Sequence, residues 1–233
     1  MKKGYSCAAL KYIAAACMLC DHIGMILFEH INFPFGDMLD VLFRSVGRWA
    51  FPLFLFCLIQ GYFYTHDKKL YAKRLFIASI LVEIPYDLGT TGHFFVWNQN
   101  NVMWTMWLIV IMCLLYDNAR LQKEKDVRFC YCGIIWAGCS LLAYVCHVEY
   151  GFAAIAAATA LYVYYNRPLF GYGLSLVSLS VLFSPIEALA LPSAFFISRY
   201  NHTKGKQSKY FFYLFYPLHL VLLRLLYLCF LYL

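Results

Sequence analysis

Apolar runs long enough to cross a lipid bilayer follow one another along almost the whole chain. A helix needs roughly 17 to 25 residues to cross about 30 Å of hydrocarbon, and it satisfies its own backbone hydrogen bonds there. Of the 233 residues, 63% are hydrophobic and 13% are charged, whereas soluble domains average about 45–50% apolar and about 25% charged residues. The sequence therefore predicts an all-α, polytopic transmembrane helical bundle that forms a single domain over residues 1–233.

Charged residues and Gly, Pro or Asn breaks divide this apolar sequence into about nine predicted helices. They cover residues 8–30, 40–65, 70–88, 101–117, 128–147, 150–165, 168–183, 186–199 and 209–232. Residues 169–198 can instead form one long helix kinked at Ser184-Pro185, which gives eight spans. Arg167 and Arg199 lie on the same side of the membrane only if the chain turns back at this point, so the charge pattern favours nine.

The positive charges predict the orientation of the bundle. With a cytoplasmic amino terminus, 16 of the 19 Lys and Arg residues fall on the cytoplasmic side, as the positive-inside rule requires. They are Lys2, Lys3, Lys11, Lys68, Lys69, Lys73, Arg74, Arg120, Lys123, Lys125, Arg128, Arg167, Arg199, Lys204, Lys206 and Lys209. We therefore expect a multi-pass protein of a cell membrane, with a bacterial plasma membrane as its location. The net charge of +7 favours contact with anionic membrane lipid, and no nucleic acid partner is expected.

Three arginines, Arg44, Arg48 and Arg224, lie inside or at the edge of predicted spans, where a charge costs about 2.5–3.5 kcal/mol on insertion scales. Other polar side chains stand at a similar depth in the outer half of the membrane. The candidates from five predicted helices are Asp21, His22, Arg44, Arg48, Glu83, Asp87, Asn101, Thr105 and His219. Each alone could be a buried pair or an interhelical hydrogen bond. Because intramembrane ionisable groups mark functional sites, the set predicts one polar cavity.

His22 is the candidate base of that cavity. Asp21 and His22 are neighbours on a helix and point about 100° apart, so we expect Glu83 or Asp87 to be the partner of the His22 ring. A neutral imidazole can take a proton from an alcohol or an amine at neutral pH. An arginine beside it can bind a phosphate or stabilise an oxyanion. The cysteines and histidines lack zinc spacing, and no metal is expected.

Short blocks at both ends of the chain resemble the TraX family of integral membrane proteins. The blocks are Leu10-Lys11-Tyr12-Ile13-Ala14, Asp21-His22-Ile23-Gly24, Gly47-Arg48-Trp49-Ala50-Phe51-Pro52-Leu53-Phe54, Glu83-Ile84-Pro85-Tyr86-Asp87, Asn101-Val102 with Thr105, and Tyr216-Pro217-Leu218-His219-Leu220. The region from about 120 to about 205 is similar mainly in hydropathy. The family is named for a conjugation protein linked to amino-terminal acetylation of pilin, and it is similar in character to the transmembrane acyltransferase superfamily.

The resemblance implies an acyltransferase that moves an acyl group, expected to be acetyl, from cytosolic acyl-CoA to a hydroxyl or amine acceptor at or beyond the membrane. Acetyl-CoA is then the co-substrate, and the acceptor is a small molecule, a glycan or a peptide. The expected catalytic residues are His22, Asp21, Arg48 and Glu83; the expected substrate-binding residues are Arg44, Asp87, Asn101, Thr105 and His219; and the expected holders of the CoA phosphates are Lys68, Lys69, Lys73 and Arg74. Direct transfer and a covalent acyl intermediate on His or Cys both remain open.

Two functions of other classes also fit the residues. Buried Asp, Glu, His and Arg side chains make proton relays in proton-coupled membrane transporters, although the sequence has no inverted repeat. A non-catalytic envelope or conjugation assembly protein is the third alternative, and its aromatic share of 20% is equally consistent with it. Besides the acceptor, the expected partners are membrane lipid and, as an open alternative, a second copy of the chain.

Overall fold

The protein is a bundle of helices. The computed structural model describes residues 4–29 and 35–232, apart from the side chains of Lys209 and Tyr210; Lys2 and Lys3 lie outside the described residues. The elements are α1 Cys7–Ile23, the π-helical turn η1 Gly24–Phe28, α2 Gly36–Gly47, α3 Ala50–Tyr64, α4 Lys68–Thr90, α5 Val102–Ala119, α6 Lys125–Val145, α7 Gly151–Val163, α8 Pro168–Leu182, the 3-10 helix η2 Pro185–Ser193, α9 Ala194–Ser198 and α10 Lys209–Leu231. The predicted all-α class is confirmed.

Five helical segments of the described chain are long and apolar enough to cross a membrane. They are Cys7–Phe28, Gly36–Tyr64, Val102–Ala119, Lys125–Val145 and Phe211–Leu231. The apolar segments Gly151–Val163, Pro168–Leu182 and Pro185–Ser198 are shorter. Helix α4 is 23 residues long, but its first two turns are basic and its second half carries Glu83 and Asp87. The structure is that of a helical membrane protein, and the count of about nine passes stays a prediction.

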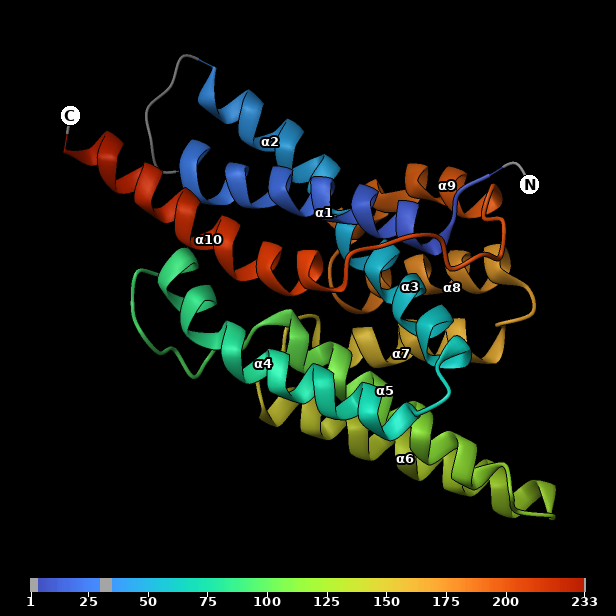
Figure 1. Cartoon of the computed structure of the whole chain (residues 1–233). Coiled ribbons are helices and arrows are strands. Elements are labelled where there is room, and N and C mark those ends of the chain that lie inside the picture. Colours follow the sequence, from blue (N-terminus) through green and yellow to red (C-terminus); the bar gives the residue numbers. More distant parts are fainter. Residues whose placement is uncertain (1–3, 30–34, 233) are drawn as a thin grey trace.

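The basic segments gather at one end of the bundle, where α1 and α4 begin (Figure 1). There the Tyr64 hydroxyl donates to the carbonyl of His202 at 3.2 Å, and the Lys68 ammonium bonds to Asp117 at 2.6 Å. These contacts join the end of α3, the start of α4, the end of α5 and the segment after α9. Helix α10 ends at the opposite end of the molecule (Figure 1).

The region predicted either as one long helix or as two is two packed segments. Helix α8 ends at Leu182, Ser184 caps the next segment, and η2 begins at Pro185 and packs back against α8. The hydroxyls of Tyr172 and Ser193 join the two at 2.6 Å. Proline has no N–H to continue a helix, so the chain breaks here. The alternative of one kinked helix over 169–198 is therefore wrong.

The segment predicted as one helix over 40–65 is one candidate span, Gly36–Tyr64, with an interruption at Arg48 and Trp49, because α2 ends at Gly47 and α3 begins at Ala50. Pro52 has no N–H with which to bond to the carbonyl four residues earlier, which is that of Arg48. The chain bends at Arg48 and Trp49 for this reason. A π-helical turn follows α1, whereas Pro85 and Pro217 stand inside α4 and α10, which continue through them.

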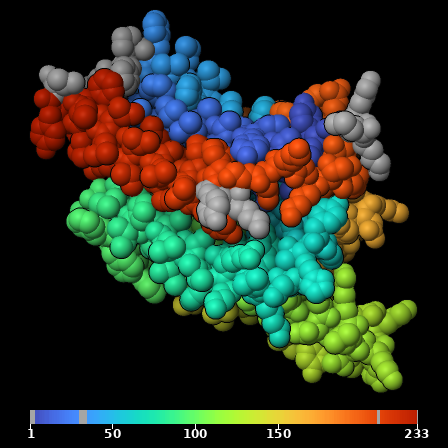
Figure 2. All heavy atoms as spheres, in the orientation of Figure 1, coloured from blue at the N-terminus to red at the C-terminus, as the bar shows by residue number. Residues whose placement is uncertain are grey.

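The core lies where α3, α5 and α7 meet α1 and α8. Its large, fully buried side chains include Leu10, Phe56, Ile109, Ile155 and Tyr172. Helices α6 and α10, by contrast, expose many apolar side chains on their outer faces. Figure 2 shows α10 lying along α4 on one face of the molecule, with the α5–α6 end projecting beyond the rest. Apolar surface on this scale is normal where the surroundings are lipid.

The distribution of charge predicts which loops face the cytoplasm. An epitope inserted after Lys123, in the α5–α6 connection, is expected to bind antibody only after the membrane is permeabilised. The same epitope inserted after His93, in the α4–α5 connection, is expected to bind antibody on intact spheroplasts. Labelling of the Lys123 insertion on intact spheroplasts would overturn the orientation.

Candidate active site

Two histidines from opposite ends of the sequence form a pair inside the bundle. Nδ1 of His22, near the end of α1, lies 2.6 Å from Nε2 of His219 in α10. The ring centroids are 4.9 Å apart, and both side chains are buried. Nδ1 of His219 lies 2.6 Å from the backbone carbonyl oxygen of Phe215, one turn earlier in α10. The imidazoles thus form a chain that ends on a backbone carbonyl.

This chain fixes where the protons lie when both rings are neutral. A carbonyl oxygen only accepts, so Nδ1 of His219 carries a proton and its Nε2 is a lone pair. Nδ1 of His22 must then donate to that lone pair. Nε2 of His22 is left without a proton, which is the state that a general base needs.

A charged network lies next to the pair, on the residue before His22. The Arg48 guanidinium, at the bend between α2 and α3, bonds to Oδ1 of Asp21 and lies 3.1 Å from Oε1 of Glu187 in η2. Arg44 lies 3.8 Å from the other oxygen of Asp21. Two guanidinium groups therefore face two carboxylates, and the network carries no net charge. It ties α1, α2 and η2 together at the level of the histidines.

Glycine is required at position 47 for this network to form. A Cβ atom at Gly47 would lie 2.4 Å from both Cβ and Oδ1 of Asp21. Contacts that short force something to move, so α2 can approach the Asp21 carboxylate only with a residue that lacks a side chain. The structure thus brings together Asp21, Arg44 and Arg48, three of the nine residues that were expected to share one polar cavity.

Arg224 lies apart from the network. Its guanidinium covers the ring of Tyr227 at 4.9 Å and packs against Gly92, whose φ of 80° is in the left-handed region. Within the described residues, no carboxylate lies at salt-bridge distance from it. Arg224 therefore anchors the α4–α5 connection to the last helix.

The expectation that Glu83 or Asp87 is the partner of His22 is wrong, because that position belongs to His219. Oε2 of Glu83 accepts from the side-chain nitrogens of Asn101, at 2.5 Å, and Trp104, at 2.6 Å. The Asn101 amide also donates to the carbonyl of Ser79, and its oxygen caps the first turn of α5. Glu83 and Asn101 therefore join α4 to α5.

Asp87 and Thr105 also hold connecting segments. The Asp87 carboxylate accepts from the backbone N–H of Val96 at 2.8 Å, which fixes the α4–α5 connection. The Thr105 hydroxyl donates to the carbonyl of Glu149 at 2.7 Å, which fixes the α6–α7 connection. Their bonds run to the backbone of these connections, at the end of the molecule opposite the basic segments.

The four predicted phosphate-binding cations differ in their surroundings. Lys68 is engaged by Asp117, which also accepts hydrogen bonds from the hydroxyls of Tyr62 and Tyr162, each at 2.6 Å. The other three, which are Lys69, Lys73 and Arg74, are exposed along the first turns of α4. Lys68 thus has a structural partner that the sequence did not indicate, and the other three are open to an anion.

Sequence reasoning missed two carboxylates, Glu187 and Glu149. Glu187 is almost fully buried, and one of its oxygens has no hydrogen-bond partner among the described residues. Its signal was present, since it is an acid inside a predicted apolar helix. Glu149 lies in the α6–α7 connection, where burial and then the nearby charge of Asp21 raise its pKa to about 7. Within the described part of the chain, no group of His, Cys, Asp and Glu is arranged to hold a metal ion.

Comparison with known proteins gives two matches. The family model described as TraX protein matches residues 6–227. A relative from Dichelobacter nodosus, described as the probable fimbrial assembly protein FimC, serogroup H1, is 25% identical over 244 aligned positions that cover 94% of this chain and 94% of the relative. No solved structure matches the chain.

Substitution of Gly47 should damage the charged network. Gly47→Ala is expected to lower the stability of the protein by roughly 1–3 kcal/mol, the usual cost of overpacking. Gly138→Ala is the matched control, because a Cβ there meets nothing within 4 Å and Ala favours a helix. Thermal unfolding in detergent measures both, and equal melting temperatures for the two variants would contradict the role given to Gly47.

Glu149 should make stability depend on pH. Its pKa is about 7 in the folded chain against an ordinary 4.5, so between these values the folded state holds more protons than the unfolded state. Stability is expected to fall as the pH rises through this window, by on the order of 1–3 kcal/mol. Glu149→Gln should flatten the dependence. Unfolding of both proteins at about pH 5 and about pH 8 measures the difference, and parallel curves would refute it.

Proposed function

The chain belongs to the TraX family, and from that premise we propose that it is a membrane acyltransferase. It moves an acyl group, which we propose to be acetyl, from cytosolic acyl-CoA to a hydroxyl or amine acceptor at or beyond the membrane. The observation that supports this most is the His22–His219 pair, whose hydrogen bonds leave Nε2 of His22 free to accept a proton.

The proposed reaction is a direct transfer. Nε2 of His22 takes the proton from the acceptor hydroxyl or amine as the acceptor oxygen or nitrogen attacks the thioester carbon. A tetrahedral intermediate forms, and its C–S bond then breaks. The proton passes from His22 to the departing sulfur, so the products are the acylated acceptor and CoA with a free thiol. His219 holds the His22 ring in the reactive tautomer throughout.

We assign the developing oxyanion to Arg44 in preference to Arg48 or Asn101. The Arg48 donors are engaged by Asp21, by Glu187 and, through Nε, by the carbonyl of Arg44. The Asn101 amide is engaged by Ser79 and Glu83. Arg44 has one long contact to Asp21 and a half-exposed side chain. Its guanidinium therefore has donors left for a negatively charged oxygen.

In this proposal the two substrates enter from opposite ends of the bundle. Acyl-CoA approaches from the basic end, which we place in the cytoplasm of a cell whose plasma membrane holds the protein. The acceptor approaches from the other end, where a pocket of ≈380 Å³ lies beside Glu149 and Tyr150. A small molecule, a glycan or a peptide amine each remains a candidate acceptor.

A second candidate function is a structural role in the assembly of surface fibres. The observation that favours it is the description of the D. nodosus relative as a fimbrial assembly protein. In that role the charged network would serve packing alone. Loss of the His22 imidazole would then leave the assembly phenotype intact as long as the protein still folds.

Turnover of acetyl-CoA by the purified protein in lipid nanodiscs tests the proposal. With a panel of envelope sugars, lipids and amino-terminal peptides as acceptors, we expect release of free CoA thiol. His22→Ala should reduce the rate by about 10²–10⁴-fold, the usual contribution of a general base. His219→Leu should also reduce it, because nothing then accepts from Nδ1 of His22.

His66→Ala is the matched control, since His66 is exposed at the basic end, far along the chain from either histidine. It should turn over acetyl-CoA like the wild type. Full activity of His22→Ala would show that His22 is not the general base. Flux of a solute across proteoliposomes without any acyl donor, together with no thiol release, would instead support a proton-coupled transporter.

A further inference from the structure

An apolar cleft lies between the basic end of the bundle and the aromatic side chains that pack on the histidine pair. Its volume is ≈160 Å³, and it lies between α1 and α10, with α3, α4 and α5 behind. Lys11 and Met18 of α1 form one wall, and Phe212, Phe215 and Tyr216 of α10 form another. Helices α1 and α10 lie side by side and run in the same direction (Figure 1).

Two aromatic side chains that line the cleft, Phe215 and Tyr216, contact the histidine pair. The ring of Tyr216 stacks on His22 with centroids 6.2 Å apart, and the ring of Phe215 stacks on His219 at 4.8 Å. On α1, Met18 lies seven residues after Lys11, and His22 lies four residues after Met18. These spacings place all three on one face of the helix. The cleft therefore follows α1 from Lys11 to Met18, one helical turn before the proposed base.

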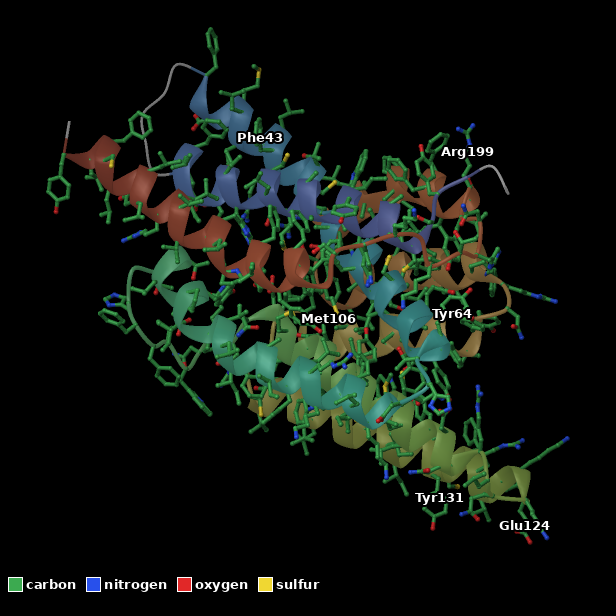
Figure 3. The ribbon with its side chains drawn as sticks, viewed as in Figure 1. Phe43, Tyr64, Met106, Glu124, Tyr131 and Arg199 are labelled. Carbon is green, nitrogen blue, oxygen red and sulfur yellow. The ribbon has the colours of Figure 1, made fainter. Side chains whose placement is uncertain are left out.

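Lys11 stands at the outer end of the cleft. Its Nζ lies 5.8 Å from the centroid of the Phe212 ring, and its side chain is half-buried. Within the described residues, no carboxylate lies at salt-bridge distance from it, in contrast to Lys68. A partly desolvated ammonium without a protein anion favours an anionic ligand. Figure 3 shows how densely side chains fill this part of the bundle between α1, α10 and α4.

We propose that this cleft binds the phosphopantetheine arm of the acyl donor, with Lys11 on the phosphate at the head of the arm and the thioester beside His22. The inference rests on the proposed function and adds the site at which the donor binds. A cleft of ≈160 Å³ is small beside the roughly 300–1,000 Å³ of ordinary ligand pockets. It suits a flexible chain and excludes the adenine nucleotide, which stays at the basic end.

The lengths agree. Lys11 and His22 are eleven residues apart in α1, which is about 16 Å at about 1.5 Å per residue. The arm has about 13 bonds between its phosphorus and its sulfur, and at the ~3.5 Å per three bonds of an extended peptide it reaches about 15 Å. Helix α4, which supplies Tyr71 and Leu75 to the cleft, carries exposed Lys73 and Arg74 in the same turns for the nucleotide phosphates.

Binding of CoA and of adenosine 3′,5′-bisphosphate, which lacks the arm, tests the inference on the full-length protein in nanodiscs. Met18→Trp fills the cleft, and it is expected to weaken CoA binding at least tenfold while leaving binding of the bisphosphate unchanged. Met38→Trp is the control, because Met38 is exposed on α2. Lys11→Ala is expected to weaken CoA binding about tenfold and to raise KM for acetyl-CoA more than it lowers kcat, and Lys11→Arg should restore most of the affinity.

The outcomes separate this inference from the proposed function. Wild-type levels of CoA binding and turnover in both Met18→Trp and Lys11→Ala would contradict the proposal that the cleft binds the donor arm. They would not contradict the proposed acyltransferase activity. A wild-type protein that binds neither CoA nor acetyl-CoA would overturn the acyltransferase itself. Lys11→Ala keeps the test informative if Met18→Trp does not fold, since Lys11 is only half-buried at the outer end of the cleft.

Discussion

The fold depends on the neutralisation of charge inside a lipid environment. An unpaired guanidinium or carboxylate at that depth is costly, so each must find a partner before the helices can pack. Asp21, Arg44, Arg48 and Glu187 meet this requirement together, since two positive and two negative groups lie in contact. Because they come from α1, α2, the bend before α3, and η2, the position of each element is set by the others. This network also positions the histidine pair, because His22 follows Asp21 directly in α1.

Interruptions of the helices make the network possible. A straight helix over residues 36–64 would carry Arg48 in mid-helix, whereas the bend caused by Pro52 sets α2 at an angle to α3 at the residue that meets Asp21 and Glu187. The π-helical turn from Gly24 follows directly after the His22 turn of α1, and such turns often occur at functional sites. Pro217 lies two residues before His219 in the same way. The irregular backbone is thus concentrated around the polar groups, where other helices surround it.

The sequence predicts the helical class and the sidedness of the loops, because hydropathy and charge determine both. It does not predict which side chains face one another across helices or where a helix bends. Apolar runs and the sidedness of Lys and Arg gave the helical bundle, and the turn at Ser184-Pro185 followed from Arg167 and Arg199. The pairing of His22 with His219 has no local signal, because the residues are 197 positions apart. The depth predicted for Glu83 along its helix says nothing about which face it occupies, and Glu83 turns toward Asn101 and Trp104. Glu187 was missed because it stands alone in its segment.

The proposed donor site has a consequence for how a group crosses the membrane. A transporter must expose its site alternately to each side, which requires two arrangements of the bundle. A donor whose arm is about 15 Å long can instead deliver its acyl group across half of the bilayer while its nucleotide stays in the cytoplasm. In the proposed mechanism Lys11 and His22, on one face of a single helix, hold the two ends of such an arm at a fixed separation. In this mechanism the bundle can remain rigid, which agrees with the ion-pair network that joins α1, α2 and η2.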